Sequence, residues 1–356
     1  MNLSLRQRAG LELQRSLRHT QARLHPLRTL FWECTLRCNM SCLHCGSDCK
    51  VQPGVPDMPA GDFLRVIDSL TPHVNPHEVF VILTGGEALL RPDLEEVGLE
   101  LYRREYPWGL VTNGYLLDAA RLQRLLESGL HSVTVSLDGL EEEHNWLRHH
   151  PQSFVRAVGA IRLLAQQRDI LWDVVTCVNP RNYARLPQLR DFLLSLGVPA
   201  WRLFSIFPMG RAAGNPELQF SDEQFRGLLD FIKECRETSS PLEVSYACEG
   251  YLGPYEGQVR DRFFHCRSGI DVASIRCDGS ISGCTSVRSH MDQGNIYRDD
   301  FWDVWQNRFH VMRDRAWARK GQCRDCRVWR YCEGSGLHLY DDGRLLTCHY
   351  RRLNAD

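Results

Sequence analysis

The sequence predicts an α/β protein in which a parallel sheet precedes a small cysteine-rich region. From Thr29 to about Phe207, short runs of β-branched and apolar residues alternate with segments in which leucines recur at helical spacing. From about Arg260 onwards, cysteines recur between short strands and turns. Because repeated βα units join by right-handed crossovers, the strands of the first part are expected to be parallel.

Composition limits the class of protein. The chain has 356 residues, a formal net charge of −1 and 43% hydrophobic residues, which suffices for one large domain and a smaller one. No apolar run approaches the ~20 residues that span a bilayer, and the N-terminus lacks the apolar region of a signal peptide. We therefore expect a cytoplasmic protein without a membrane partner. Without a basic block, we also expect no nucleic-acid partner.

The first of four expected regions is an N-terminal helical segment, residues 1–27. Leucines recur there near helical spacing, which predicts one amphipathic helix: Leu5, Leu13, Leu17 and Leu24. This helix could dock a peptide, act as a transit peptide, lie on a membrane surface or cover one end of the fold.

The second region, residues 28–215, is expected to hold six parallel strands with helices between them. The strands are one that ends at Trp32, then Val79–Leu83, Gly109–Val111, Ser132–Leu137, Leu171–Val178 and Trp201–Phe207. Residues 216–259 are expected to form a helical linker, because Ser221–Gln224 is a capping box that begins a helix. Residues 260–356 then form the cysteine-rich domain.

Three cysteines follow the first strand directly. Cys38, Cys42 and Cys45 stand at i, i+4 and i+7. A structural zinc or an ordinary 4Fe–4S cluster takes four protein ligands, so three thiolates leave one metal coordination site open. In a chain with fifteen cysteines and no sign of secretion, this cluster favours metal over disulfides, with zinc as an alternative.

Other informative residues fall at the ends of the following strands. Gly85, Gly86 and Glu87 follow the second strand, Asn113 follows the third and Ser136 ends the fourth. In parallel α/β barrels the active site lies at the carboxyl ends of the strands, so one shared site is expected.

The CxxxCxxC spacing and these strand ends together resemble the radical S-adenosylmethionine (SAM) superfamily. The resemblance implies a partial (β/α)6 barrel and a 4Fe–4S cluster held by Cys38, Cys42 and Cys45, whose open iron binds SAM. The glycine turn resembles the GGEP motif, whose backbone and Glu87 equivalent contact the SAM ammonium group, although Ala88 stands where proline is usual.

The same resemblance assigns three further SAM contacts. Ser136 and Arg148, twelve residues apart, match residues that bind the ribose and carboxylate of SAM, and an arginine fork suits a carboxylate. The backbone of His44 matches a position that meets the adenine. Cys34 and Cys49 flank the loop, either as substitute ligands or catalytic thiols or, more simply, as thiols that bind no metal.

The C-terminal cysteines resemble a SPASM domain, which holds auxiliary 4Fe–4S clusters. This implies one complete set of four thiolates, with zinc as its alternative: Cys323, Cys326, Cys332 and Cys348. A second set retains Cys266 and Cys284 but has Gly336 at the position of its last cysteine. Cys277 or Cys248 could replace the missing thiolate, an iron could stay open, or the site could be absent. At least one auxiliary cluster is therefore expected.

The resemblance implies an enzyme that cleaves SAM reductively and takes a hydrogen atom from its substrate. A peptide or protein is the first expectation for that substrate, and a tetrapyrrole or another small metabolite is the alternative. The electrons are expected from an external donor of the flavodoxin or ferredoxin type. A non-enzymatic iron–sulfur electron carrier or redox sensor is the rival interpretation.

Overall fold

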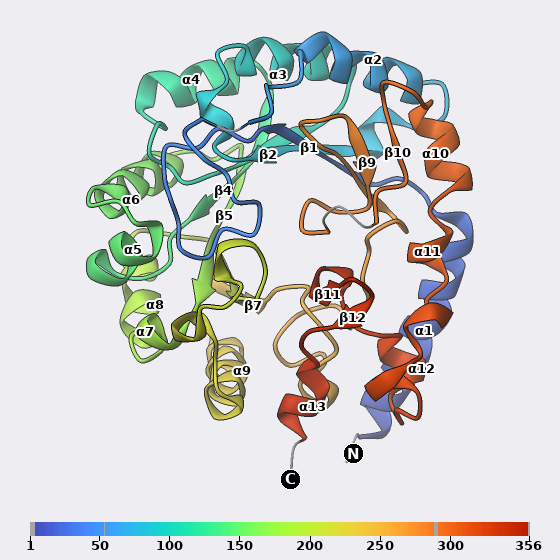
Figure 1. The fold of residues 1–356 in the computed structure, drawn as a ribbon. Coiled ribbons are helices and arrows are strands. Elements are labelled where there is room, and N and C mark those ends of the chain that lie inside the picture. The colour runs from blue at the N-terminus through green and yellow to red at the C-terminus, as the bar shows by residue number, and fades with distance from the viewer. Residues whose placement is uncertain (1–3, 53, 288–290, 355–356) are drawn as a thin grey trace.

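A curved ten-stranded sheet with helices on its outer face organises the chain (Figure 1). The computed structural model describes residues 4–52, 54–287 and 291–354. The strand order is β10-β9-β8-β1-β2-β3-β4-β5-β6-β7, and neighbouring strands from β8 to β7 are parallel. The strands of this sheet are β1 Thr29–Thr35, β2 Phe80–Gly85, β3 Trp108–Thr112, β4 Leu130–Ser136, β5 Leu171–Val178, β6 Ala200–Ser205, β7 Glu243–Tyr246, β8 Val272–Ile275, β9 Ser280–Ser282 and β10 Gly294–Asn295.

The helices and one small hairpin complete the fold. The hairpin pairs β11 Tyr340–Asp341 with β12 Arg344–Leu345. The helices are α1 Leu5–Leu24, α2 Ala60–Leu70, α3 Leu94–Arg103, α4 Ala119–Glu127, α5 Glu141–Arg148, α6 Ser153–Leu164, α7 Pro180–Tyr183, α8 Leu186–Ser195, α9 Asp222–Glu237, α10 Phe301–Asn307, α11 His310–Arg313, α12 Trp329–Cys332 and α13 His349–Leu353. Among the described residues, no helix has the length and hydropathy needed to cross a bilayer.

The six strands expected from the sequence are all present, and the expected α/β fold class is confirmed. β5 has the predicted bounds, whereas β1 continues past Trp32 to Thr35, because Glu33 and Thr35 pair with the end of β2. The outer face of β1 packs on the helices, where Trp32 stacks on Phe63 of α2 with ring centroids 4.2 Å apart.

The expected linker, residues 216–259, needs one amendment. Its helix α9 begins at the predicted capping box, with Ser221 as N-cap. The segment then adds β7, which pairs in parallel with β6 and extends the sheet. At the other side, β8 from the cysteine-rich region pairs in parallel with β1. The sheet and one hydrophobic core therefore run across the boundaries expected from the sequence.

The N-terminal helix is present but does not bury its leucines. The four leucines of the predicted apolar face are exposed by 48–83%: Leu5, Leu13, Leu17 and Leu24. The buried face instead carries Leu11 and Arg18, and Arg18 pairs with Glu333 at 2.7 Å. The apolar cluster around Leu11 and the Arg18–Glu333 ion pair together hold α1 on the C-terminal domain, where it lies beside α12 (Figure 1).

The loop that carries the three cysteines crosses the end of β2 at Gly85 and Gly86. A Cβ atom on Gly85 would lie 2.1 Å from the carbonyl oxygen of Thr35, and one on Gly86 would lie 2.0 Å from that of Arg37. Gly85 also has φ of +129°. The glycines are therefore required by the backbone crossing, which fixes the cysteine loop against β2.

We predict that Gly85→Ala lowers the free energy of unfolding by about 2–5 kcal/mol, because it adds backbone strain to overpacking. Gly159→Ala in α6 is the matched control, since nothing lies within 4 Å of its added Cβ, and it should stabilise by about 0.5–1 kcal/mol. Denaturant unfolding of both variants measures this. Equal stability of Gly85→Ala and the unsubstituted chain would contradict the crossing as the reason for the glycine.

Candidate functional site

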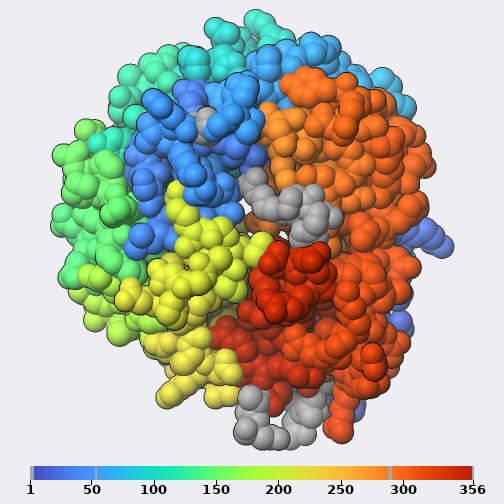
Figure 2. Space-filling model, in the orientation of Figure 1, coloured from blue at the N-terminus to red at the C-terminus, as the bar shows by residue number. Residues whose placement is uncertain are grey.

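The cysteine loop is held by a backbone hydrogen bond between its two ends and by an arginine from the segment after β6. The amide of Cys38 donates to the carbonyl oxygen of Lys50 at 2.9 Å. Arg211, which follows β6, donates from Nε to the carbonyl oxygen of Cys42 at 2.8 Å and from Nη1 to that of Cys49 at 2.9 Å. Figure 2 shows the loop (blue) against the segment that follows β6 (yellow). The loop is thus positioned at the carboxyl ends of the strands, as expected.

The three loop thiols differ in their electrostatic surroundings. Burial raises the pKa of Cys38 to about 12, and burial also raises the pKa of Cys42 against the opposing charge of Arg148. A hydrogen bond from the Cys49 thiol lowers the pKa of Cys45 to about 5. Buried thiols of this kind ionise when a metal supplies positive charge, so the loop fits a metal centre.

The two flanking cysteines lie in different places. Cys34 is fully buried and donates from Sγ to the carbonyl oxygen of Thr84 at 3.2 Å. Cys49 is buried inside the loop, and its thiol is hydrogen-bonded to the sulfur atom of Cys45. Cys49 is therefore placed to adjust the loop sulfurs, whereas Cys34 is tied to the end of β2.

Glu87 joins the end of β2 to the end of β3. Its carboxylate is fully buried and accepts hydrogen bonds from Thr112 Oγ1 at 2.7 Å, from the amide of Asn113 at 2.8 Å and from that of Leu89 at 3.2 Å. Burial raises its pKa. These bonds occupy the buried carboxylate, whereas Gly85 and Gly86 of the same turn are partly exposed.

Beyond β4, a buried ion pair organises the site. Ser136 ends β4, and Arg148 at the end of α5 donates from Nε to Asp138 Oδ2 at 2.6 Å. Nη1 of Arg148 lies 3.8 Å from the Sγ atom of Cys42. Burial is the largest influence and alone would raise the pKa of Asp138, but Arg148, the two nearby histidines and the amide of Cys177 together hold that pKa below its usual value. Arg148 therefore reaches from Asp138 to the cysteine loop.

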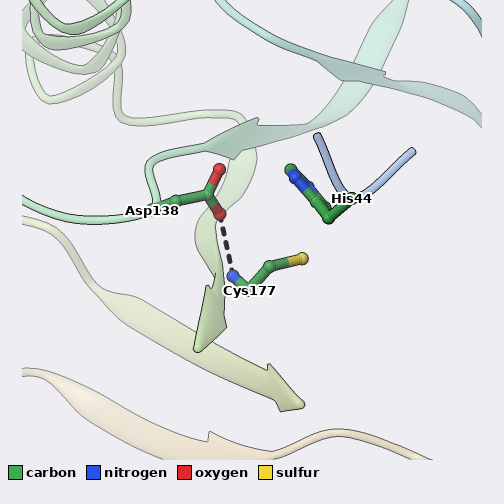
Figure 3. Close-up of side chains that lie close together, drawn as sticks. All are labelled: His44, Asp138 and Cys177. Carbon is green, nitrogen blue, oxygen red and sulfur yellow. Dashed lines mark hydrogen bonds between the residues drawn. The ribbon is translucent and has the colours of Figure 1, made fainter. Parts of the chain in front are cut away.

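His44, Asp138 and Cys177 point toward one another from three segments (Figure 3). Their ligand atoms lie within 4.8 Å of one another. Asp138 Oδ1 accepts the amide of Cys177 at 2.8 Å, while His44 Nδ1 is buried and has no hydrogen-bond partner among the described residues. Because Asp138 already has Arg148 as its counter-ion, a metal is not needed there for charge balance.

In the C-terminal domain the predicted four-thiolate set comes together. Its sulfur atoms lie close enough for a charge on one to raise the pKa of another: Cys323, Cys326, Cys332 and Cys348. Cys266 and Cys284 of the second set also interact, and Cys248 joins them. All fifteen cysteines lie in the described part of the chain and are free thiols.

Buried cations beside these thiols fit anionic clusters. Arg18 interacts electrostatically with Cys266 of one set and Cys332 of the other. Arg315 lies near Arg18, and its Nη1 and Nη2 atoms are buried without a hydrogen-bond partner among the described residues. Only Nε of Arg315 has a partner, the carbonyl oxygen of Met312 at 3.0 Å. Burying the other guanidinium nitrogens without partners is costly, and a negatively charged iron–sulfur cluster at these thiols would offset that cost.

Sequence reasoning assigned no role to Asp138, Cys177 and Arg211. The strand-end argument could have found Asp138 and Cys177, because they follow β4 and lie at the end of β5. Arg211 gave no local signal, since its contacts are with a loop far away in the sequence.

Two family models match the chain. Residues 32–193 match the Radical SAM superfamily, and residues 266–327 match the SPASM iron–sulfur cluster-binding domain. The first match includes the cysteine loop and the ends of β1 to β5, and the second includes Cys266, Cys284, Cys323 and Cys326.

Named relatives are similar over most of their lengths. An AdoMet-dependent heme synthase of Methanosarcina barkeri is 25% identical over 338 residues, which are 88% of this chain and 92% of the relative. An Fe-coproporphyrin III synthase of the same organism is 26% identical over 85% and 82% of the two chains. The mycofactocin maturase MftC of Mycobacterium tuberculosis is 27% identical over 86% and 77%.

A solved structure supports the fold. The structure described as native anSMEcpe with bound AdoMet and Cp18Cys peptide superposes with a TM-score of 0.71 at 18% identity, covering 92% of this chain and 94% of that one. At this identity, the likeness concerns the fold alone.

We predict that Arg148→Ala weakens SAM binding by roughly 1.5–3 kcal/mol, the scale of a hydrogen bond to a charged group. The single variant also leaves the buried Asp138 without its counter-ion, which destabilises by about 3–5 kcal/mol. The double variant Arg148→Ala/Asp138→Asn removes that charge and should recover most of the stability while SAM binding stays weak. Equilibrium binding of SAM to the reconstituted variants measures this. A double variant that binds SAM like the unsubstituted chain would exclude Arg148 from the SAM site.

Proposed function

The chain belongs to the radical SAM superfamily and carries a C-terminal SPASM domain, and on this premise we propose that it modifies a tetrapyrrole. The observation that carries this proposal is the similarity to a heme synthase over 88% of this chain and 92% of that protein. The similarity to an Fe-coproporphyrin III synthase agrees with it. Because the chain is an enzyme of this family, the electron-carrier interpretation is set aside.

The peptide substrate, which was the first expectation from the sequence, is less well supported. A mycofactocin maturase is among the relatives, but the chain covers 77% of its length. The N-terminal helix, one candidate for peptide docking, packs on the C-terminal domain through its buried face and leaves four leucines exposed on the other, so it does not decide between the substrates. The two tetrapyrrole synthases among the relatives favour the alternative that the sequence left open.

The cofactors of the family are 4Fe–4S clusters and SAM, and this chain has residues that would hold them. Cys38, Cys42 and Cys45 would hold the SAM-binding cluster, and Cys323, Cys326, Cys332 and Cys348 an auxiliary one. When bound, the first cluster and SAM supply a carbon-centred radical that removes a hydrogen atom from an unactivated carbon. Buried thiols and buried cations would suit either zinc or a cluster, and the match to an iron–sulfur cluster-binding domain supports the cluster.

The chain's own residues would position SAM and keep water out. Gly85 and Gly86 present backbone at the end of β2, and Ser136 lies at the end of β4. Arg148 is held by Asp138 through Nε, and its Nη1 atom faces Cys42 of the cysteine loop. His44 lies beside Asp138, with its ring in the site and its backbone next to Cys45. Electrons would come from an external donor of the flavodoxin or ferredoxin type.

We predict that the variant Cys38→Ala/Cys42→Ala/Cys45→Ala keeps iron in the C-terminal domain but loses SAM cleavage. Anaerobic reconstitution of the unsubstituted chain should give at least two clusters with about four irons each. Iron analysis and dithionite-dependent formation of 5′-deoxyadenosine measure the two effects. If the triple variant still makes 5′-deoxyadenosine, the assignment of the loop is wrong.

One relative is named for the synthesis of iron coproporphyrin III. We predict that this porphyrin binds the reconstituted chain and that binding shifts the Soret band of the porphyrin saturably. With SAM and dithionite, it should raise 5′-deoxyadenosine formation at least about threefold above the rate without it. The triple cysteine variant is the control: it should keep the Soret shift and make no 5′-deoxyadenosine. No Soret shift and no stimulation would contradict the tetrapyrrole proposal.

A further inference from the structure

The second thiol set has three members that lie together. Cys248 follows β7, and its sulfur interacts electrostatically with those of Cys284 and Cys266. Cys277, the other candidate from the sequence, lies elsewhere: its Sγ atom donates to the carbonyl oxygen of Pro56 at 3.2 Å. Cys248, Cys266 and Cys284 therefore form a three-thiol site, and its fourth ligand would come from position 336.

Position 336 is a glycine, but the space for its side chain is filled. A Cβ atom added to Gly336 would lie 2.6 Å from Cε1 and 2.9 Å from Nδ1 of His338. The same Cβ would lie 2.9 Å from the carbonyl oxygen of Glu249, the residue after Cys248. The imidazole of His338 thus stands where a cysteine side chain at 336 would begin, beside the segment that carries Cys248.

His338 also has a free ligand atom. Its Nε2 atom is buried and has no hydrogen-bond partner among the described residues. The ring packs against Phe207, with centroids 5.0 Å apart, so it is held in place. Leaving a buried nitrogen without a partner is costly, and neutral imidazole is a common metal ligand.

We propose that His338 Nε2 replaces the missing thiolate and completes a Cys3His auxiliary 4Fe–4S cluster with Cys248, Cys266 and Cys284. This rests on the cofactors of the family and is independent of the substrate. A neutral imidazole in place of a thiolate makes the cluster less negative, which raises its reduction potential, as in Rieske centres. It also closes the last iron to substrate and water.

A neighbouring histidine is the rival ligand. His265 precedes Cys266, and its Nε2 atom is also buried without a partner among the described residues. Its Nδ1 atom lies 2.9 Å from Gln14 Nε2 of α1. His265 does not occupy the space of the missing side chain at 336, so the geometry favours His338.

The test uses the full chain, reconstituted anaerobically without SAM and labelled with ¹⁵N only in histidine. Pulsed electron paramagnetic resonance of the reduced clusters should show a strong ¹⁵N hyperfine coupling from a ligated nitrogen. His338→Ala should lose this coupling, while the control His265→Gln should keep it. No strong coupling in the unsubstituted chain, or loss only in His265→Gln, would overturn the proposal.

A second variant covers the case in which His338→Ala fails to fold. Gly336→Cys/His338→Ala restores a thiolate at position 336 and removes the ring that a Cβ there would meet, which leaves the 2.9 Å approach to the carbonyl oxygen of Glu249 to be relieved by a small backbone shift. It should keep the iron content, lose the ¹⁵N coupling and lower the midpoint potential of one cluster. An unchanged set of potentials together with a retained coupling would overturn the proposal.

Discussion

The site depends on the buried ion pair between Asp138 and Arg148. Asp138 follows β4, accepts the amide of Cys177 in β5 and binds Arg148 at the end of α5. The pair therefore joins three elements around the cysteine loop, where Arg148 also meets Cys42. Breaking a buried pair leaves an uncompensated charge at a cost of about 3–5 kcal/mol. The position of positive charge beside the loop is thus fixed by the fold, and any thiolate there forms opposite a guanidinium.

The same rule of charge compensation governs the C-terminal domain, with one difference. Arg18 is paired with Glu333 and lies between the two thiol sets, whereas Arg315 presents buried nitrogen atoms without a partner among the described residues. Burying these charged nitrogen atoms without partners costs free energy. Cluster binding would supply the missing negative charge, so metal binding would favour folding of this domain.

Local patterns made much of this structure predictable. The spacing of Cys38, Cys42 and Cys45, the capping box at Ser221 and the strand ends are short-range signals, and the family, fold class and cofactors inferred from them are confirmed. The four-residue strand β7 was not predicted, because so short a strand is defined by its pairing with β6 rather than by its own sequence. The buried face of α1 was mispredicted because its partners, the apolar cluster around Leu11 and Glu333 opposite Arg18, lie far away in the sequence. The site residues assigned by resemblance remain predictions.

The partial barrel explains why the second thiol set matters for the fold. The parallel part of the sheet ends at β7 on one side and at β8 on the other, so it is open between them. Cys248 follows β7, whereas Cys266 precedes β8 and Cys284 follows β9, and these thiols lie together. Glu249 also joins the β7 edge to the C-terminal domain, since its carboxylate is hydrogen-bonded to Ser205 of β6, Tyr246 of β7 and His349 of α13. A metal centre at the three thiols would therefore join the two edges of the open sheet and fix its curvature, and with it the spacing between the cysteine loop and the C-terminal domain.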